Sequence, residues 1–414
     1  MNQPVPSDSF LTRFARPVLL RLFDRIQRGE LTVHADGGTR RFGRPDPAEP
    51  SAELRVENGD FFADTLFGGS IGLAEAYIKG AWHTPDLTAL IRLGLRNREL
   101  ADGLDTGWSW LVGKLRDTLA FLRRNTLCGS RRNILAHYDL SNEFFQLLLD
   151  PTMMYSCAIF EREGMSLEEA SIAKNDRICR KLGLKPEDHL LEIGSGWGGF
   201  AIHAAGRYGC RVTTTTISDA QFELASQRIR AAGLENRITL LKQDYRNLQG
   251  QFDKLVSIEM IEAVGYQFYP AYFAACSRLL APDGLMLIQA ITIDDRRYEK
   301  AKRTVDFIQR YIFPGGCLPS VAAIADAIRD HTNLRLTHLE DITEFYPPTL
   351  RAWCRRMTEN RESVKALGFD ERFLRMWEFY FAYCEAGFLE RWIGNVQMLF
   401  AKPACRAPAI FGQL

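Results

Sequence analysis

The segment Leu-Leu-Glu-Ile-Gly-Ser-Gly-Trp-Gly-Gly at 190–199 has the residue types of a cofactor-binding turn. An apolar run followed by closely spaced glycines predicts a buried strand, a tight turn and then a helix, expected here over 200–207. Glycine permits the unusual backbone angles and the close ligand approach that such a turn needs. The backbone amides at the start of the helix would then point at the bound group. The segment therefore predicts a nucleotide-type cofactor site in an open α/β sheet.

Two cofactors compete for this turn. The dinucleotide pattern G-x-G-x-x-G, with an acid about 20 residues later, is matched by Gly194, Gly196, Gly199 and Asp219. The pattern E-x-G-x-G-x-G, typical of S-adenosylmethionine sites, is matched by Glu192, Gly194, Gly196 and Gly198. A carboxylate at position 192 would offset the positive charges of a sulfonium and an ammonium group in a desolvated cleft. We therefore favour S-adenosylmethionine over a nicotinamide dinucleotide.

The composition restricts the class of protein. A chain of 414 residues with 46% hydrophobic and 25% charged residues is long enough for two or three globular domains. The formal net charge of +1 gives no argument for a nucleic-acid partner. No run of 18 apolar residues predicts a membrane span. Nine cysteines without a C-x-x-C spacing indicate a reduced, cytoplasmic protein, and the histidines form no metal-binding motif.

Apolar runs separated by helical patterns predict a doubly wound, Rossmann-like α/β sheet over the region 126–414. The expected strands are 189–193, 211–217, 238–242, 254–258, 285–290 and 395–401. Between about 294 and 388 the sequence predicts a mainly helical insertion, rich in aromatic residues, that forms a substrate wall or lid.

Residues 1–125 predict a smaller, mainly helical domain that ends in a linker helix over about 95–132. A basic amphipathic helix is expected from Pro17 to Gly29, with Arg21, Arg25 and Arg28 on its polar side. This helix could lie on an anionic membrane surface, or it could pack on its own domain. The alternation around Asp36-Gly37-Gly38 predicts a hairpin over 30–42.

A set of motifs in this order resembles one family over roughly residues 60–402. They are His-Tyr-Asp-Leu-Ser-Asn (137–142), Met-Tyr-Ser-Cys-Ala-Ile-Phe (154–160), the glycine-rich turn (191–199), Thr-Ile-Ser-Asp-Ala-Gln (216–221), Glu-Met-Ile-Glu-Ala-Val-Gly (259–265), Tyr-Ile-Phe-Pro-Gly-Gly (311–316) and Ala-Tyr-Cys-Glu-Ala-Gly-Phe (382–388). The chain is similar to the cyclopropane-fatty-acyl-phospholipid synthases and their mycolic-acid-modifying relatives.

The resemblance implies a particular reaction and location. An S-adenosylmethionine-dependent enzyme would add a methylene across the cis double bond of unsaturated phospholipid acyl chains. It would do so at the inner face of the membrane, as a peripheral cytoplasmic protein and a possible homodimer. A methyl- or methylene-branching lipid methyltransferase is the main alternative, and a silent lipid- or nucleotide-binding module is a further one.

The resemblance also implies the cofactor contacts. The family uses Thr-Ile-Ser and a later glutamine in place of a ribose-binding acid, which corresponds to Thr216, Ile217 and Gln221 and weakens the nicotinamide hypothesis. Tyr155 and Ser156 would contact the methionine end. Gln243 and Asp244 would meet the adenine, although Asp244 could instead cap the following turn.

Methylation of an alkene leaves a carbocation, so the site must exclude water, present aromatic faces and hold a base. In the family the base is thought to be a bound bicarbonate ion. The implied ligands are Cys157, Glu262, Gln289, the backbone of Ile291, and Tyr346. Two positions depart from the family pattern. Gln289 stands where the family usually has a histidine, and Ala263 stands where it often has one. A glutamine can donate a hydrogen bond but cannot transfer a proton, which keeps the branching alternative open.

Overall fold

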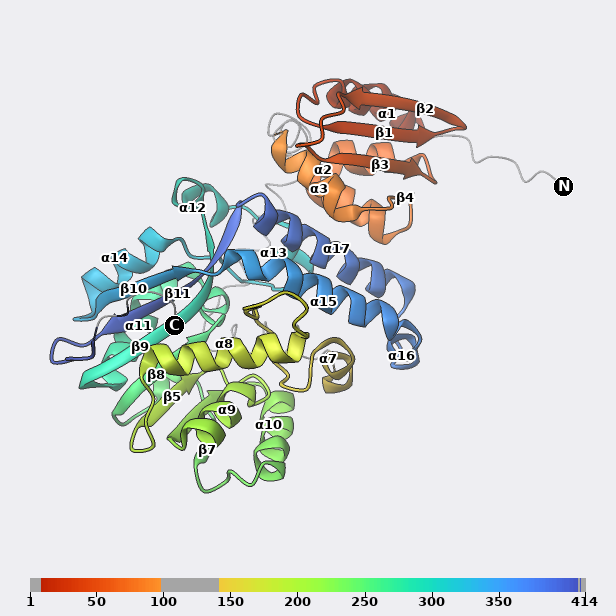
Figure 1. Ribbon diagram of the computed structural model, residues 1–414. Helices are drawn as coiled ribbons and strands as arrows, with labels where there is room; N and C mark the ends of the chain where they lie inside the picture. Colours follow the sequence, from red (N-terminus) through yellow and green to blue (C-terminus); the bar gives the residue numbers. More distant parts are fainter. Residues whose placement is uncertain (1–8, 98–140, 409, 411–414) are drawn as a thin grey trace. The chain divides into compact units, whose positions relative to one another are not determined.

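The computed structural model describes residues 9–97, 141–408 and 410, which form two compact units (Figure 1). The first unit combines Met1–Leu122 with Thr304–Ile312 and Gly368–Arg391, and the remainder of the chain forms the second. The predicted division into 1–125 and 126–414 is therefore wrong for two segments of the expected insertion, which pack into the first unit. The expected linker helix and most of the motif at 137–142 lie outside the described residues.

The second unit is built on a seven-stranded sheet of order β10-β11-β9-β8-β5-β6-β7. β11 is antiparallel to β9 and β10, and the pairs among β9, β8, β5, β6 and β7 are parallel. This arrangement confirms the predicted α/β class, and every strand expected from an apolar run is present. The strands are β5 (His189–Ile193), β6 (Arg211–Thr216), β7 (Ile238–Lys242), β8 (Phe252–Ile258), β9 (Leu280–Ile293), β10 (Arg335–Asp341) and β11 (Ile393–Ala401).

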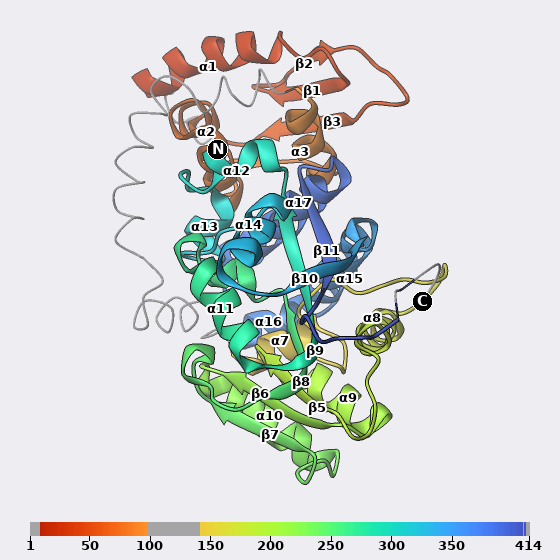
Figure 2. The same ribbon diagram turned by 90° about the vertical axis from the view of Figure 1, so that its left-hand side faces the viewer.

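Helices cover both faces of this sheet (Figures 1 and 2). One buried cluster joins the sheet to α8 and α9 through residues such as Ile178 and Phe200. A second cluster joins the opposite face to α11 and α14 through Phe273 and Ile324. The helices of this unit are α7 (Asn142–Leu148), α8 (Leu167–Leu182), α9 (Gly199–Tyr208), α10 (Asp219–Ala231), α11 (Tyr269–Leu279), α12 (Asp295–Ala301), α14 (Val321–His331), α15 (Tyr346–Glu359) and α16 (Arg361–Ala366).

The region 294–388 differs from the predicted helical insertion. It contains α14 and the edge strand β10, which belong to the sheet and its covering layer. The strand was not predicted because most of its side chains are at least partly exposed at the sheet edge, so it lacks an apolar run. Residues 294–388 therefore do not form a continuous lid.

The first unit contains a four-stranded sheet of order β2-β1-β3-β4 and helices from both ends of the chain. The predicted hairpin is confirmed, since β1 and β2 pair around Asp36 and Gly37. The elements are α1 (Phe10–Phe23), β1 (Glu30–Ala35), β2 (Gly38–Gly43), β3 (Ser51–Val56), α2 (Asp60–Ile78), β4 (Trp82–His83), α3 (Leu87–Arg96), α13 (Phe307–Tyr311) and α17 (Glu371–Leu389). None of the helices in the described part of the chain has the length and apolarity to cross a bilayer.

The predicted bounds of the basic helix are wrong. Helix α1 begins at Phe10, is capped by the Ser9 side chain, and continues through Pro17 to Phe23. The Ser9 hydroxyl accepts a hydrogen bond from the backbone of Thr12 and so provides the start signal that Pro17 was expected to give.

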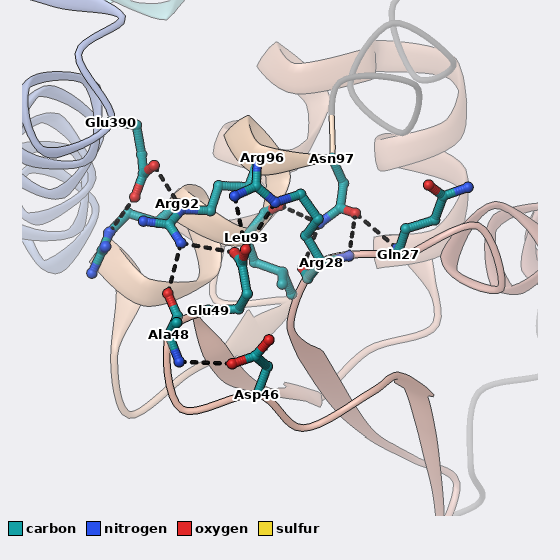
Figure 3. Close-up of polar contacts among 10 residues, drawn as sticks. All are labelled: Gln27, Arg28, Asp46, Ala48, Glu49, Arg92, Leu93, Arg96, Asn97 and Glu390. Atoms are coloured by element: carbon teal, nitrogen blue, oxygen red, sulfur yellow. Dashed lines mark hydrogen bonds and ion pairs between the residues drawn. The ribbon is translucent and has the colours of Figure 1, made fainter.

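Charged contacts hold α17 within the first unit (Figure 3). The Glu390 carboxylate, which follows α17, accepts hydrogen bonds from Arg92 and Arg96 of α3, each at 2.7 Å. Arg96 also donates to Glu49, which in turn pairs with Arg28. The first unit is therefore assembled from segments almost 300 residues apart in the sequence.

Candidate active site

The turn between β5 and α9 has the backbone conformation that its glycines predict. Gly194, Gly196 and Gly198 have φ angles of +98°, +49° and +84°, in the region that other residues rarely adopt. At Gly199 the constraint is space, because a Cβ there would lie 2.3 Å from the carbonyl oxygen of Thr152. The turn therefore requires glycine for two distinct physical reasons.

This turn forms one wall of a cavity at the carboxyl ends of the parallel strands, where open α/β sheets bind ligands. Every residue predicted to bind the cofactor lines it, except Gly198, which caps α9. These residues are Tyr155, Ser156, Glu192, Gly194, Gly196, Thr216, Ile217, Gln221, Gln243 and Asp244. The structure thus brings together residues from four separate stretches of the chain.

Glu192 is a buried acid at the end of β5. Burial raises its pKa to about 8, although the Thr214 hydroxyl donates a hydrogen bond to it at 2.5 Å. Nearby, the Lys174 ammonium donates to the Ser156 hydroxyl at 3.1 Å, and burial lowers the pKa of Lys174 to about 8. The cavity wall therefore holds a buried acid, and a buried ammonium lies behind it, hydrogen-bonded to Ser156 of the wall.

The end of β6 and the segment after it line the cavity with Thr216, Ile217 and Gln221. The Thr216 hydroxyl donates to the Gln221 side chain at 2.9 Å, which holds that amide beside the cavity. Ser218, and not Asp219, is the N-cap of α10. Asp219 pairs with Lys242 and is not among the residues that line the cavity. A dinucleotide would therefore lack the acid that its fingerprint requires.

Asp244 both lines the cavity and caps a turn. Its carboxylate accepts a backbone hydrogen bond from Arg246 at 3.0 Å and pairs with the Arg246 guanidinium. Burial alone would raise the pKa of Asp244, but the hydrogen bonds from Arg246 bring it below its usual value. The two functions weighed for this residue are thus compatible, because the cap leaves it on the cavity wall.

The predicted catalytic side chains converge on a residue that the sequence analysis did not select, Glu259. Its Oε1 accepts hydrogen bonds from the backbone of Cys157 at 3.0 Å, from Gln289 at 2.9 Å and from Asn395 at 2.5 Å. Its Oε2 accepts one from the Tyr346 hydroxyl at 2.7 Å. Glu259 also lines the cavity next to the glycine-rich turn.

Glu262 and Ile291 form a separate contact. The Ile291 backbone N–H donates to Glu262 Oε1 at 2.6 Å, while the buried Oε2 has no hydrogen-bond partner among the described residues. Burial, reinforced by the charge of Glu259, raises the pKa of Glu262 to about 8. Burial therefore favours the neutral, protonated form of Glu262 at pH 7.

The predicted bicarbonate ligands do not fit bicarbonate as expected. The Tyr346 hydroxyl and the Gln289 amide donate to Glu259, and the Ile291 N–H donates to Glu262. The Cys157 thiol is buried and donates to the Ala158 carbonyl at 3.3 Å, and burial raises its pKa, so it stays protonated. The donors that were expected to bind an anion therefore donate to the carboxylates of Glu259 and Glu262.

The orientation of the Gln289 side chain is determined by a chain of hydrogen bonds. Lys181 donates to Gln397 at 2.7 Å, and Gln397 donates to the Gln289 oxygen at 2.9 Å. Because its oxygen accepts this bond, the Gln289 amide must direct its N–H₂ toward Glu259. Gln289 is thus a fixed donor in this network.

Aromatic rings pack beside the polar cluster. The ring of Tyr155 lies 5.0 Å from Trp353 and 5.4 Å from Phe145, and Tyr346 lies 6.3 Å from Trp353. The ring centroids of Phe313 and Tyr155 lie 6.4 Å apart. Phe307 and Tyr311 pack against each other within the first unit.

Three contributors were missed by sequence reasoning: Glu259, Asn395 and Lys174. Glu259 is the first residue of the motif at 259–265 and follows an apolar strand directly, which is the signal that could have identified it. Its φ of +47° marks a backbone that non-glycine residues seldom adopt. Lys174 lies in the charged segment that forms α8, and nothing in its local sequence distinguishes it from an exposed lysine.

Comparison with known proteins agrees with this geometry. Residues 127–398 match the family model described as mycolic acid cyclopropane synthetase. The chain is 40% identical over 368 residues to tuberculostearic acid methyltransferase UfaA1 of Mycobacterium tuberculosis, covering 86% of this chain and 84% of that protein. It is 38% identical over 356 residues to cyclopropane-fatty-acyl-phospholipid synthase of Escherichia coli, covering 85% and 88%.

Among solved structures, mycolic acid cyclopropane synthase CmaA1 complexed with SAH and CTAB superposes with a TM-score of 0.61. It is 33% identical and covers 66% of this chain and 98% of that one. The strand order, the glycine-rich turn and these matches lead to one conclusion: the chain belongs to the mycolic acid cyclopropane synthetase family and has the fold of the S-adenosylmethionine-dependent methyltransferases.

Proposed function

We propose that this protein transfers a methyl carbon from S-adenosylmethionine to the cis double bond of unsaturated acyl chains in phospholipids. One observation carries the proposal: the glycine-rich turn and a carboxylate held by four hydrogen-bond donors line the same cavity. A methyl donor and a base can therefore act on one substrate carbon.

The cofactor supplies an electrophilic methyl group when bound. Gly194 and Gly196 would allow its close approach, and Glu192 would balance its positive charge. Thr216 would fix Gln221 beside it. Tyr155 and Ser156 would contact its methionine end, and Gln243 and Asp244 its adenine, as the sequence predicts. This assignment accounts for the residue types around the cavity.

Methyl transfer turns the acyl chain into a carbocation, which the site must stabilise and shield from water. The alkene π electrons form the new C–C bond while the S–CH₃ bond breaks, leaving positive charge on the neighbouring chain carbon. The faces of Tyr155 and Trp353 would stabilise this charge by about 0.5–2 kcal/mol each. Loss of a proton from the added methyl group then closes a cyclopropane ring. If a 1,2-hydride shift first moves the positive charge to the carbon that bears the methyl group, loss of the same proton leaves a methylene branch instead.

Methyl or methylene branching is the second candidate product. It is favoured by Gln289, which cannot transfer a proton, and by the 40% identity to a protein named as a tuberculostearic acid methyltransferase. Cyclopropane formation is favoured by the 38% identity to the Escherichia coli synthase. A cyclopropane and a methylene branch add the same atoms to the chain and require a chemical test, whereas a saturated methyl branch carries two further hydrogens.

That test uses vesicles of cis-unsaturated phospholipid, the protein and S-adenosylmethionine, with mass spectrometry of the lipids. A gain of one CH₂ per alkene in chains that resist hydrogenation supports the cyclopropane. The same gain in chains that still take up hydrogen supports a methylene branch. Absence of any gain, with cofactor binding demonstrated, contradicts the proposed function.

Peripheral attachment to the cytoplasmic face of the membrane is part of the proposal. Phe10, Leu11 and Phe14 at the start of α1 are 85%, 55% and 54% exposed, and Arg21 and Arg25 of the same segment are also exposed. Apolar tips flanked by basic residues suit an anionic lipid surface. Arg28, expected to share this function, is instead paired with Glu49 within the fold.

Sedimentation with anionic vesicles tests this attachment. Replacement of Phe10, Leu11 and Phe14 by serine should remove most of the bound fraction. Charge reversal at Arg21 and Arg25 should also lower binding, and added salt should no longer weaken what remains. Binding equal to that of the unaltered protein would exclude α1 as the contact. Sedimentation equilibrium of the protein without vesicles tests the predicted homodimer.

A further inference from the structure

The geometry points to Glu259 as the base that removes the proton from the methylated acyl chain, in the position expected for bicarbonate. This inference rests on the proposed function and names the group that completes its reaction. It adds a catalytic residue that the sequence motifs alone did not indicate.

The first argument is the identity of the donors. Cys157, Gln289 and Tyr346 were each expected to surround a bound anion, and all of them donate to the Glu259 carboxylate through backbone or side chain. Asn395 of β11 adds a further donor at 2.5 Å. A carboxylate and bicarbonate share the same planar O–C–O group, so a site built for one suits the other.

The second argument concerns the two oxygens of Glu259. Oε1 accepts hydrogen bonds from three N–H groups, those of Cys157, Gln289 and Asn395, which occupy its lone pairs. Oε2 accepts the Tyr346 hydroxyl and retains acceptor capacity. Because Glu259 lines the cavity wall, we assign the proton transfer to Oε2.

The third argument concerns Glu262, the acid that interacts with Glu259. Glu262 is buried, and burial together with the nearby Glu259 raises its pKa, so its neutral form is favoured. The buried Lys174 ammonium also interacts electrostatically with the Glu259 carboxylate. Glu262 is therefore the acid of the pair that holds a proton, whereas Glu259 is the carboxylate toward which four hydrogen-bond donors are directed.

The step is balanced as follows. The C–H bond of the added methyl group breaks, its electron pair forms the ring-closing C–C bond, and the proton passes to Glu259 Oε2. After a 1,2-hydride shift to the neighbouring cationic carbon, the same electron pair forms the C=C bond of a methylene branch. The carbocation is neutralised and Glu259 becomes a neutral carboxylic acid. The proton passes to water when the product leaves. No bicarbonate, oxidant or reductant takes part.

Activity assays in carbonate-free buffer test the assignment. The unaltered protein should turn over at the same rate with and without added bicarbonate. Glu259→Gln keeps the size of the side chain and should lower the rate by about 10²–10⁴-fold, while affinity for S-adenosylhomocysteine changes less than about threefold. Glu259→Ala should regain activity with added acetate or bicarbonate. The control is Glu187→Ala. Glu187 is an exposed acid just before the amino end of β5, whereas the cavity lies at the carboxyl ends of the strands.

A thermal melt gives a second readout that needs no lipid substrate. Bicarbonate should raise the Tm of Glu259→Ala above the effect of equal chloride, and it should leave the unaltered protein and Glu187→Ala unchanged. A bicarbonate requirement or Tm increase in the unaltered protein overturns the assignment, as does full activity of Glu259→Gln. If no phospholipid is alkylated, the proposed function fails, and the melts still decide whether Glu259 occupies the anion position.

Discussion

At the scale of single residues, the charge of Glu192 should couple cofactor binding to pH. Its pKa of about 8 means that it is protonated below that pH, whereas a sulfonium and an ammonium favour the carboxylate. Binding of S-adenosylmethionine at pH 6.5 should therefore release a proton, and affinity should rise toward pH 8 by up to about tenfold per unit. Calorimetry in buffers of different ionisation enthalpy measures the release. Glu192→Gln should abolish it, and an unchanged release in that variant would assign the proton elsewhere.

At the scale of elements, the contact between the start of α9 and the segment before Tyr155 sets the shape of the cofactor turn. Gly199→Ala would place a Cβ 2.3 Å from the Thr152 carbonyl, so we expect a loss of about 1–3 kcal/mol in unfolding free energy and weaker cofactor binding. Gly206→Ala lies in the same helix, where a Cβ would lie 3.7 Å from a Leu234 methyl. This control should be neutral or stabilising by up to about 1 kcal/mol. Equal urea midpoints for the two variants would refute the steric argument.

At the scale of the whole molecule, the first unit depends on segments from the far end of the sequence. Arg375 of α17 is 9% exposed and donates to the carbonyls of Tyr77 and Trp82 at 2.6 and 3.0 Å. A polypeptide of residues 1–125 would lose these contacts and would leave its Tyr77 and Trp82 surfaces uncovered. We expect it to lack a cooperative thermal transition by circular dichroism, in contrast to the full chain. A sharp transition in the isolated polypeptide would contradict this dependence.

The sequence by itself determined the sheet and the cofactor turn. A parallel strand buried on both faces must be an almost continuous apolar run, and a turn with positive φ angles must contain glycine, so both are visible locally. The strands β5 and β7 have the predicted bounds, and the residues expected around the cofactor share one cavity. The edge strand β10 lacks an apolar run because its side chains are partly or fully exposed. The start of α1 is marked only by the Ser9 cap, which is a weaker local signal.

Only the tertiary structure decided which groups meet at the centre of the site. Glu259 looks like any acid at the end of a strand until Cys157, Gln289, Tyr346 and Asn395, from four distant segments, direct their donors at it. The same is true of α17, whose membership of the first unit depends on ion pairs across almost 300 residues. Periodicity and spacing record a residue's local neighbours, whereas hydrogen bonds and charges act through space, between residues that only the folded chain brings together.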